Sequence, residues 1–226
     1  MTTALPVIVF DVNETLSDMS PMGVRFSDVG APAELAKLWF ATLLRDGFAL
    51  TASGDNGSFA AIGAEVLREL LTGVEVDRPL DSAVEHVMGG MTGLAVHPDV
   101  PAGVRALSAA GFRLITLSNG SARIAGKLFS EAGIRDEFEM LLSVEDAPAW
   151  KPARASYEYA AGAAATETSA MLLVAVHPWD IHGAARAGLR TAWLNRTGAA
   201  YPGYFEAPEI TVTALTELPA AVAATD

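Results

Sequence analysis

A short apolar run that ends in a carboxylate is the feature that most constrains this chain. The run Val7-Ile8-Val9-Phe10 leads directly into Asp11. Apolar, β-branched segments of this length are typical of buried parallel strands. Ligands bind at the carboxyl ends of such strands in open α/β sheets, and a carboxylate there can act as a covalent nucleophile. A turn or a helix cap is the alternative role for a lone Asp, and features further along the chain favour the nucleophile.

Beyond this strand the sequence pattern divides the chain into two parts. Between about residues 20 and 96 the apolar residues recur at helical spacing, and no convincing strand is present. Helices are expected at 33–45, 58–71 and 81–88, the last two capped by Ser58 and Asp81. From residue 98 onward strands alternate with helices; the strands are expected at 112–117, 138–144, 171–176, 191–194 and 210–212.

This alternation predicts an α/β fold with a doubly wound parallel sheet and right-handed crossovers. We expect residues 1–17 and 96–226 to form the α/β core, and residues 18–95 to form an inserted, all-helical cap subdomain.

Composition excludes several classes of function. Of the 226 residues, 51% are hydrophobic and 19% charged, which supports a sizeable core. The net charge of −12, without a cluster of Lys and Arg, argues against nucleic acid and anionic membranes as partners. The absence of cysteine excludes disulfides, thiolate metal sites and a Cys nucleophile. No signal peptide or membrane span is evident, so we expect a cytoplasmic protein.

Polar residues also follow the later strands, at the edge where parallel strands end together. Ser118 and Asn119 can hold an anionic oxygen or a leaving group. Lys151 stands alone in a segment with few charges, and His177 and Asp180 follow the strand at 171–176. Each has a simple structural explanation as a turn, a surface charge or a loop residue. Their joint placement predicts an active site.

In these residues the chain resembles the haloacid dehalogenase-like superfamily. Four motifs occur in the family's order: Phe10-Asp11-Val12-Asn13-Glu14-Thr15-Leu16, Leu117-Ser118-Asn119, Lys151-Pro152 and Asp180. The resemblance covers nearly the whole chain, including a helical cap inserted after the first strand. It implies a Rossmann-like core with Asp11 as the nucleophile.

Two departures separate the chain from the phosphatases of that superfamily. Phosphatases carry a second Asp that protonates the leaving alcohol, whereas this chain has Asn13, which cannot act as a general acid. They also hold Mg²⁺ with paired acids near the fourth motif, where this chain has Val176. Asp11 and Asp180 alone are a poor Mg²⁺ site, because the ion requires several oxygen ligands in octahedral geometry. A halide leaves without a proton or a metal, so we expect neither a metal nor a cofactor.

Ser118-Asn119-Gly120 and the spacing from Lys151-Pro152 to Tyr157 resemble the type II L-2-haloacid dehalogenases in particular. This resemblance implies that halide is displaced from a short 2-haloalkanoic acid through an ester on Asp11, giving a 2-hydroxy acid. The family is often dimeric, so a homodimer is expected. The alternatives are a Mg²⁺-dependent phosphatase or phosphonatase, and a non-catalytic protein that binds a small carboxylate.

The same resemblance assigns roles around Asp11. Lys151 would keep the Asp11 carboxylate ionised and oriented, and Tyr157 would position Lys151 or the substrate carboxylate. Asn119 would donate on the halide side. The groups expected to bind carboxylate oxygens are Thr15, Ser118 and backbone N–H groups, those of Val12 and Asn13 included.

Hydrolysis of the ester requires an activated water. In the family, an Asp at the fourth motif, here Asp180, usually takes part. This chain adds His177, whose imidazole suits a general base near neutral pH, and Glu14, which can hold its tautomer. We predict that His177 is the base, that Glu14 orients it, and that Asp180 anchors Lys151. The rival hypothesis is that Asp180 acts and that His177 only packs beside Trp179.

The cap departs from the well-known type II enzymes, which carry an Arg in the first cap helix that reaches the halide and the carboxylate. Alignment of that helix on residues 38–45 places Glu34 at the position, leaving Arg25 and Arg45 as substitutes. An apolar pocket would strengthen the nucleophile by excluding water. The side chains expected to line it are Trp39, Phe48 and Phe59, with a place in the cap core as their alternative.

Overall fold

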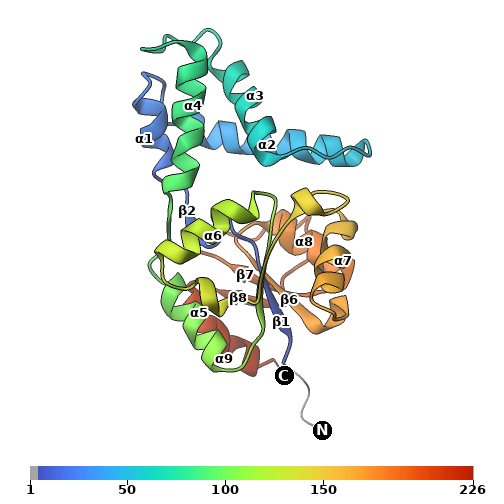
Figure 1. Cartoon of the computed structure of the whole chain (residues 1–226). Helices are drawn as coiled ribbons and strands as arrows, with labels where there is room; N and C mark the ends of the chain where they lie inside the picture. The colour runs from blue at the N-terminus through green and yellow to red at the C-terminus, as the bar shows by residue number, and fades with distance from the viewer. Residues whose placement is uncertain (1–4, 226) are drawn as a thin grey trace.

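The computed structural model describes residues 5–225 and places a six-stranded parallel sheet at the centre of the core (Figure 1). The strand order is β5-β4-β1-β6-β7-β8. The strands are β1 (Val7–Phe10), β4 (Leu114–Ser118), β5 (Met140–Ser143), β6 (Met171–Ala175), β7 (Arg190–Leu194) and β8 (Ile210–Val212). Strand β1 lies between β4 and β6, where the strand order reverses. Asp11 therefore stands at the topological switch point, where open α/β sheets bind their ligands.

Helices cover both faces of the sheet, as the doubly wound prediction requires. Side chains of β1 alternate between the faces: Ile8 and Phe10 pack with α5, α6 and α9, whereas Val7 and Val9 pack with α7 and α8. These helices are α5 (Val100–Ala109), α6 (Ala122–Glu131), α7 (Arg154–Ala163), α8 (Pro178–Ala187) and α9 (Leu218–Ala223). Short 3₁₀ turns complete the connections: η1 (Met91–Gly93), η2 (Arg135–Glu137), η3 (Val144–Asp146), η4 (Thr168–Ala170) and η5 (Leu215–Glu217). The predicted α/β fold is confirmed.

Four further helices lie beyond the carboxyl ends of the core strands (Figure 1). They are α1 (Met22–Ser27), α2 (Leu35–Ala52), α3 (Phe59–Leu71) and α4 (Leu80–Gly90). In the sequence these helices lie between β2 (Ser17–Asp18) and β3 (Ala95–Val96). The two strands pair as a short antiparallel ribbon, which the sequence pattern did not predict. Helix α1 was also missed, and α2 extends well past the expected end at residue 45.

The two predicted caps have different outcomes. Ser58 caps α3 as predicted, because its side chain accepts a hydrogen bond from the N–H of Ala61. The prediction for Asp81 is wrong: α4 begins at Leu80 after Pro79, and Asp81 lies in the first turn, where its charge faces the positive end of the helix.

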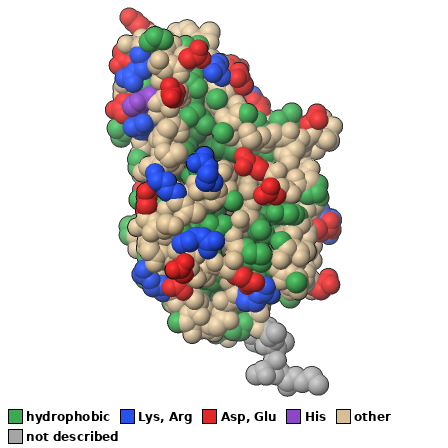
Figure 2. Space-filling view, in the orientation of Figure 1, with side chains coloured by type: hydrophobic (Ala, Val, Ile, Leu, Met, Phe, Trp, Pro, Cys, Tyr) green, Lys and Arg blue, Asp and Glu red, His purple; other side chains and the backbone are tan. Residues whose placement is uncertain are grey.

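The surface carries both signs of charge. On the face drawn in Figure 2, basic side chains are interspersed with acidic ones and with apolar areas. Within residues 5–225, no helix combines the length and apolarity needed to cross a lipid bilayer.

Helix α2 reaches the core at Trp150, the residue before Lys151. The indole N–H of Trp150 donates to the Gly57 carbonyl at 2.9 Å, and its backbone N–H donates to Thr51 Oγ1 at 3.1 Å. The close approach of α2 to Trp150 depends on Gly47, because a Cβ atom there would lie 2.4 Å from the Trp150 ring. Real Cβ contacts do not become this short, so any larger residue displaces either the helix or the indole.

We expect Gly47→Ala to lower the free energy of unfolding by about 1–3 kcal/mol, the usual cost of overpacking. Gly162→Ala in α7 is the matched control, because no neighbour lies within 4 Å of its added Cβ. Alanine favours helix formation, so the control should be neutral or stabilising by up to about 1 kcal/mol. Urea denaturation of both variants measures the difference, and equal stabilities would show that the contact at Gly47 is not tight.

Candidate active site

Asp11 is buried at the end of β1, and both of its carboxylate oxygens accept hydrogen bonds. Lys151 Nζ donates to Oδ1 at 2.9 Å, and the Thr15 hydroxyl donates to Oδ2 at 2.6 Å. Burial by itself raises the pKa of Asp11, but Lys151, His177 and Thr15 together outweigh it and hold that pKa below its ordinary value. Asp11 is thus an oriented, ionised carboxylate, the state that a nucleophile requires.

Lys151 connects Asp11 to a second buried carboxylate. Its ammonium is fully buried and also donates to Asp180 Oδ2 at 2.6 Å, while the Tyr157 hydroxyl donates to Asp180 Oδ1 at 2.6 Å. Burial lowers the pKa of Lys151, but Asp11 and Asp180 outweigh this effect and raise it above its ordinary value. Burial raises the pKa of Asp180, with the charge of Asp11 acting in the same direction and Lys151 opposing it. Burial, followed by Asp180, also raises the pKa of Tyr157 well above its ordinary value, so the phenol remains a donor.

Three residues predicted to bind or position the substrate make hydrogen bonds within the protein. The Thr15 hydroxyl donates to Asp11 and accepts from the Val176 N–H at 3.1 Å, so it orients the nucleophile. The Asn119 amide binds the backbone of Lys151, donating from Nδ2 to its carbonyl at 3.1 Å and accepting its N–H at 3.0 Å. Tyr157 acts on Lys151 only through Asp180. Apart from Asp11, which is four residues from Thr15, these partners come from distant parts of the chain, so spacing could not reveal them.

His177 lies beside the nucleophile. Its Nε2 atom is 3.6 Å from Asp11 Oδ2, 3.7 Å from Glu14 Oε2 and 3.2 Å from the Asn13 carbonyl oxygen. Glu14 therefore approaches the same ring nitrogen that faces Asp11, whereas the predicted dyad would place it on the opposite nitrogen. The His177 ring also stacks on Trp179, with ring centroids 5.0 Å apart, as the rival hypothesis proposed.

Glu14 adopts a backbone conformation that is unusual for a residue with a side chain. Its φ is +61°, in the left-handed region that costs a residue with a Cβ about 1 kcal/mol or more. His97 Nε2 hydrogen-bonds the Glu14 carbonyl at 2.9 Å, and Arg196 donates to the Thr15 carbonyl at 2.9 Å. Sequence reasoning assigned no role to His97 and did not consider Arg196. The only signal for His97 was its position directly after the cap segment.

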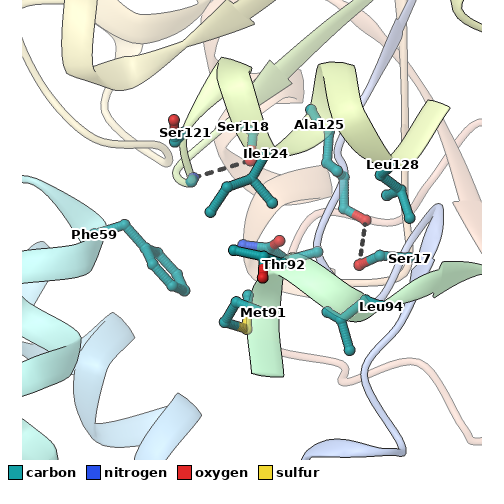
Figure 3. A pocket seen from close by; sticks show the side chains of 13 residues that line it. Ser17, Phe59, Met91, Thr92, Leu94, Ser118, Ser121, Ile124, Ala125 and Leu128 are labelled. Atoms are coloured by element: carbon teal, nitrogen blue, oxygen red, sulfur yellow. Dashed lines mark hydrogen bonds between the residues drawn. The ribbon is translucent and has the colours of Figure 1, made fainter. Parts of the chain in front are cut away.

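A small cavity lies between Ser118 and Phe59 (Figure 3), and its wall includes Val12, the residue after Asp11. It measures about 20 Å³. Four residues predicted to bind substrate line it, namely Val12, Asn13, Phe59 and Ser118. The Ser118 oxygen accepts the Gly120 N–H at 2.9 Å, which leaves its own proton free to be donated.

The other two predicted aromatic residues lie elsewhere. Trp39 is buried inside the cap, where its indole donates to the Gly63 carbonyl at 2.9 Å, so its alternative as a cap-core residue is the correct one. Phe48 packs edge-on against Trp179, with ring centroids 5.0 Å apart. Phe40 is the aromatic residue that the prediction missed: its ring lies 6.2 Å from the His177 ring and 6.4 Å from that of Phe59.

Neither candidate for the missing cap arginine points to Asp11. Arg45 is exposed and pairs with Asp46 at 2.8 Å, while Arg25 donates to the His86 carbonyl at 2.9 Å. Glu34 lines a second and larger cleft together with Lys37 and Phe40.

The residues around Asp11 do not fit Mg²⁺. Lys151 Nζ occupies the position between Asp11 and Asp180, where a bridging cation would have to bind both carboxylates. Asn13 and Val176 supply no further acidic ligand. In the part of the chain that the structure describes, no cluster of three or more His, Asp or Glu could hold a metal ion.

Comparisons with known proteins find relatives that match most of the chain. The model of the haloacid dehalogenase-like hydrolase family matches residues 5–188. The chain is 31% identical to the (S)-2-haloacid dehalogenase of Pseudomonas sp. (strain YL), over 92% of this chain and 90% of that protein. It is 29% identical to haloacetate dehalogenase H-2 of Moraxella sp. (strain B), over 92% and 93% of the two chains.

Solved structures give the same fold. An L-2-haloacid dehalogenase at 25% identity superposes with a TM-score of 0.89, covering 98% of this chain and 100% of that one. The L-2-haloacid dehalogenase from Xanthobacter autotrophicus, solved with chloropropionic acid covalently bound, superposes with a TM-score of 0.85. It covers 99% of this chain and 100% of its own, and at 22% identity it supports the fold alone.

We expect the stability difference between the wild type and Asp11→Asn to depend on pH. The lowered pKa of Asp11 means that ionisation of this carboxyl stabilises the fold above pH 3.8, its ordinary pKa, and that this contribution is lost as the pH falls through the lowered value. Urea denaturation of both proteins between pH 7 and pH 3 should show the wild type losing its advantage on the acid side. A difference that stays constant over this range would contradict the assignment.

Proposed function

This chain belongs to the haloacid dehalogenase-like hydrolases, and on that premise we propose that it is a metal-independent dehalogenase of 2-haloalkanoic acids. The observation that carries the proposal is the state of Asp11, which is ionised, held by Lys151 and Thr15, and followed by Asn13 rather than by a general acid. The dehalogenase names of its relatives support the same substrate class.

In the first step, an Asp11 oxygen attacks C2 of the haloacid in line with the carbon–halogen bond. A carbon–oxygen ester bond forms, and the halide leaves with the bonding electron pair, so no proton is needed and the configuration inverts. Ser118 and the backbone N–H groups of Val12 and Asn13 would bind the substrate carboxylate. The position of these residues supports this role, because all three line the Ser118 cavity and Val12 directly follows Asp11.

In the second step, water attacks the ester carbonyl carbon of Asp11, and the bond between this carbon and the ester oxygen breaks. The departing alkoxide takes up the proton that the water gave to the base, so that the 2-hydroxy acid leaves and Asp11 is restored.

We assign His177 as the base that takes the proton from this water, because its Nε2 atom lies 3.6 Å from Asp11 Oδ2. This role requires the neutral tautomer with its proton on Nδ1, in which Nε2 does not donate to the Asn13 carbonyl. Glu14, 3.7 Å from the same nitrogen, would stabilise the imidazolium by its charge. Asp180 is less suited, because Lys151 and Tyr157 occupy its two oxygens.

The cap supplies the second half of this site. We propose that residues 18–95 act as one unit that shields the ester from bulk water, since Phe59 and Met91 from this segment line the Ser118 cavity together with Val12 and Asn13. A homodimer and a cytoplasmic location are further proposals, which rest on the family resemblance.

The direct test is halide release from L- and D-2-chloropropionate in the presence of EDTA. We expect release from the L isomer only, and none from Asp11→Asn, since the amide cannot form the ester. A phosphatase would instead require Mg²⁺ and act on phosphoesters, and a binding protein would release no halide from either isomer.

We expect His177→Ala and Glu14→Gln to release about one halide per active site and then stall as a trapped ester, because only the second step is impaired. Rapid-quench halide assays and intact-protein mass spectrometry detect both events. His182→Ala is the control, since His182 accepts a hydrogen bond from the Glu206 N–H away from Asp11. Full turnover by both variants would return the base role to Asp180.

A further inference from the structure

A second cleft, of about 600 Å³, shares no lining residue with the Ser118 cavity. It runs between α1 and α2 of the cap and the segments that follow β6 and β7 of the core. Its wall includes Glu14, Phe40 and His177. His177 connects this wall to the reacting carboxylate, because its Nε2 atom is 3.6 Å from Asp11 Oδ2.

The two spaces differ greatly in size. The Ser118 cavity, at about 20 Å³, has room for about one water-sized group, such as a carboxylate oxygen or a halide. A volume of about 600 Å³ lies within the range of about 300–1,000 Å³ found for small-molecule sites. A substituent larger than methyl on C2 therefore fits on the cleft side and not on the Ser118 side.

The chemistry of the cleft favours an uncharged alkyl group as its ligand. The cap side contributes apolar groups, among them Met19, Met22 and Ala36, and the core side contributes Trp193. Two of its basic groups are already engaged: Arg196 binds Asp99 at 2.8 Å, and His97 binds the Glu14 carbonyl at 2.9 Å. Lys37 is a third basic group, but the acidic residues Glu14, Asp18 and Glu34 outnumber it and would repel a second anionic group. An alkyl chain meets none of these penalties.

We propose that this cleft binds the C2 substituent of the substrate and makes the enzyme selective for 2-haloacids with unbranched alkyl chains of medium length. The inference rests on the proposed dehalogenase function and adds a substrate class to it. The carboxylate and the halide stay at the Asp11 end, and the alkyl chain extends past His177 and Phe40 toward α1 and α2.

A longer alkyl chain on C2 of the substrate should therefore raise kcat/KM. A fully buried methylene is worth about a fourfold gain in affinity, and a cleft open to solvent gives less than that per group. We expect kcat/KM for L-2-bromooctanoate to exceed that for L-2-bromopropionate by about tenfold or more.

Two variants test whether the cleft is responsible. Ala36→Trp fills the cleft from α2, and Ala33→Phe fills it from the segment just before that helix; both residues line the cleft without contacting Asp11. Leu38→Trp is the matched control, because Leu38 is on the same helix, is 50% exposed and does not line the cleft. We expect the filling variants to lose the preference for octanoate and to keep wild-type activity on 2-bromopropionate.

Equal kcat/KM for the two substrates in the wild type would overturn the inference, as would an octanoate preference that survives in both filling variants. Competitive inhibition by 2-hydroxyoctanoate relative to lactate gives a second readout that needs no turnover, and it should weaken in the same two variants. Absence of halide release from 2-bromopropionate as well would contradict the proposed function itself, an outcome distinct from a missing chain-length effect.

Discussion

The ammonium of Lys151, buried between Asp11 and Asp180, is the interaction on which the rest of the site depends. Removing charged groups from water is costly, and removing one partner of a buried ion pair typically costs about 3–5 kcal/mol. The surrounding contacts keep all three groups in place. Tyr157 holds Asp180, Asn119 holds the Lys151 backbone, and the neighbouring Trp150 packs against α2. One buried cation thus orients the nucleophile, and its immediate chain neighbour joins core to cap.

A second set of contacts ties the catalytic loop to the base of the cap. Three successive carbonyls of this loop accept hydrogen bonds from outside it. His97 binds the carbonyls of Glu14 and Leu16 through its ring and its backbone N–H, and Arg196 binds that of Thr15. His97 directly follows β3, the strand that returns the chain from the cap. The left-handed Glu14, whose carboxylate faces His177, is therefore fixed by residues at the junction of cap and core.

Local patterns in the sequence were sufficient for the sheet, because apolar runs and helical periodicity are local properties. The ribbon of β2 and β3 was missed because two-residue strands have no periodicity. Trp39 and Phe40 show a second limit: adjacent helical positions point about 100° apart, and sequence alone did not reveal which one faces the site. Phe40 faces His177, and Trp39 packs inside the cap.

Motif order placed Asp11, Lys151 and Asp180 together, since parallel strands end at one edge. Thr15 and Asn119 were predicted to bind the substrate, and in the structure their side chains also hold protein groups in place. Their partners, the Val176 N–H and the Lys151 backbone, become neighbours only in the folded chain. Resemblance therefore identified the reaction class, whereas the function of each supporting group required the structure.

The most direct measurement of the central claim is a single turnover in H₂¹⁸O with enzyme in excess over L-2-chloropropionate. If Asp11 is the nucleophile, the oxygen of the new hydroxyl comes from its carboxylate. Lactate should then contain no ¹⁸O, and the peptide containing Asp11 should gain one ¹⁸O when water opens the ester. Appearance of ¹⁸O in lactate, with an unlabelled Asp11 peptide, would mean that water attacks the substrate directly and would contradict the account.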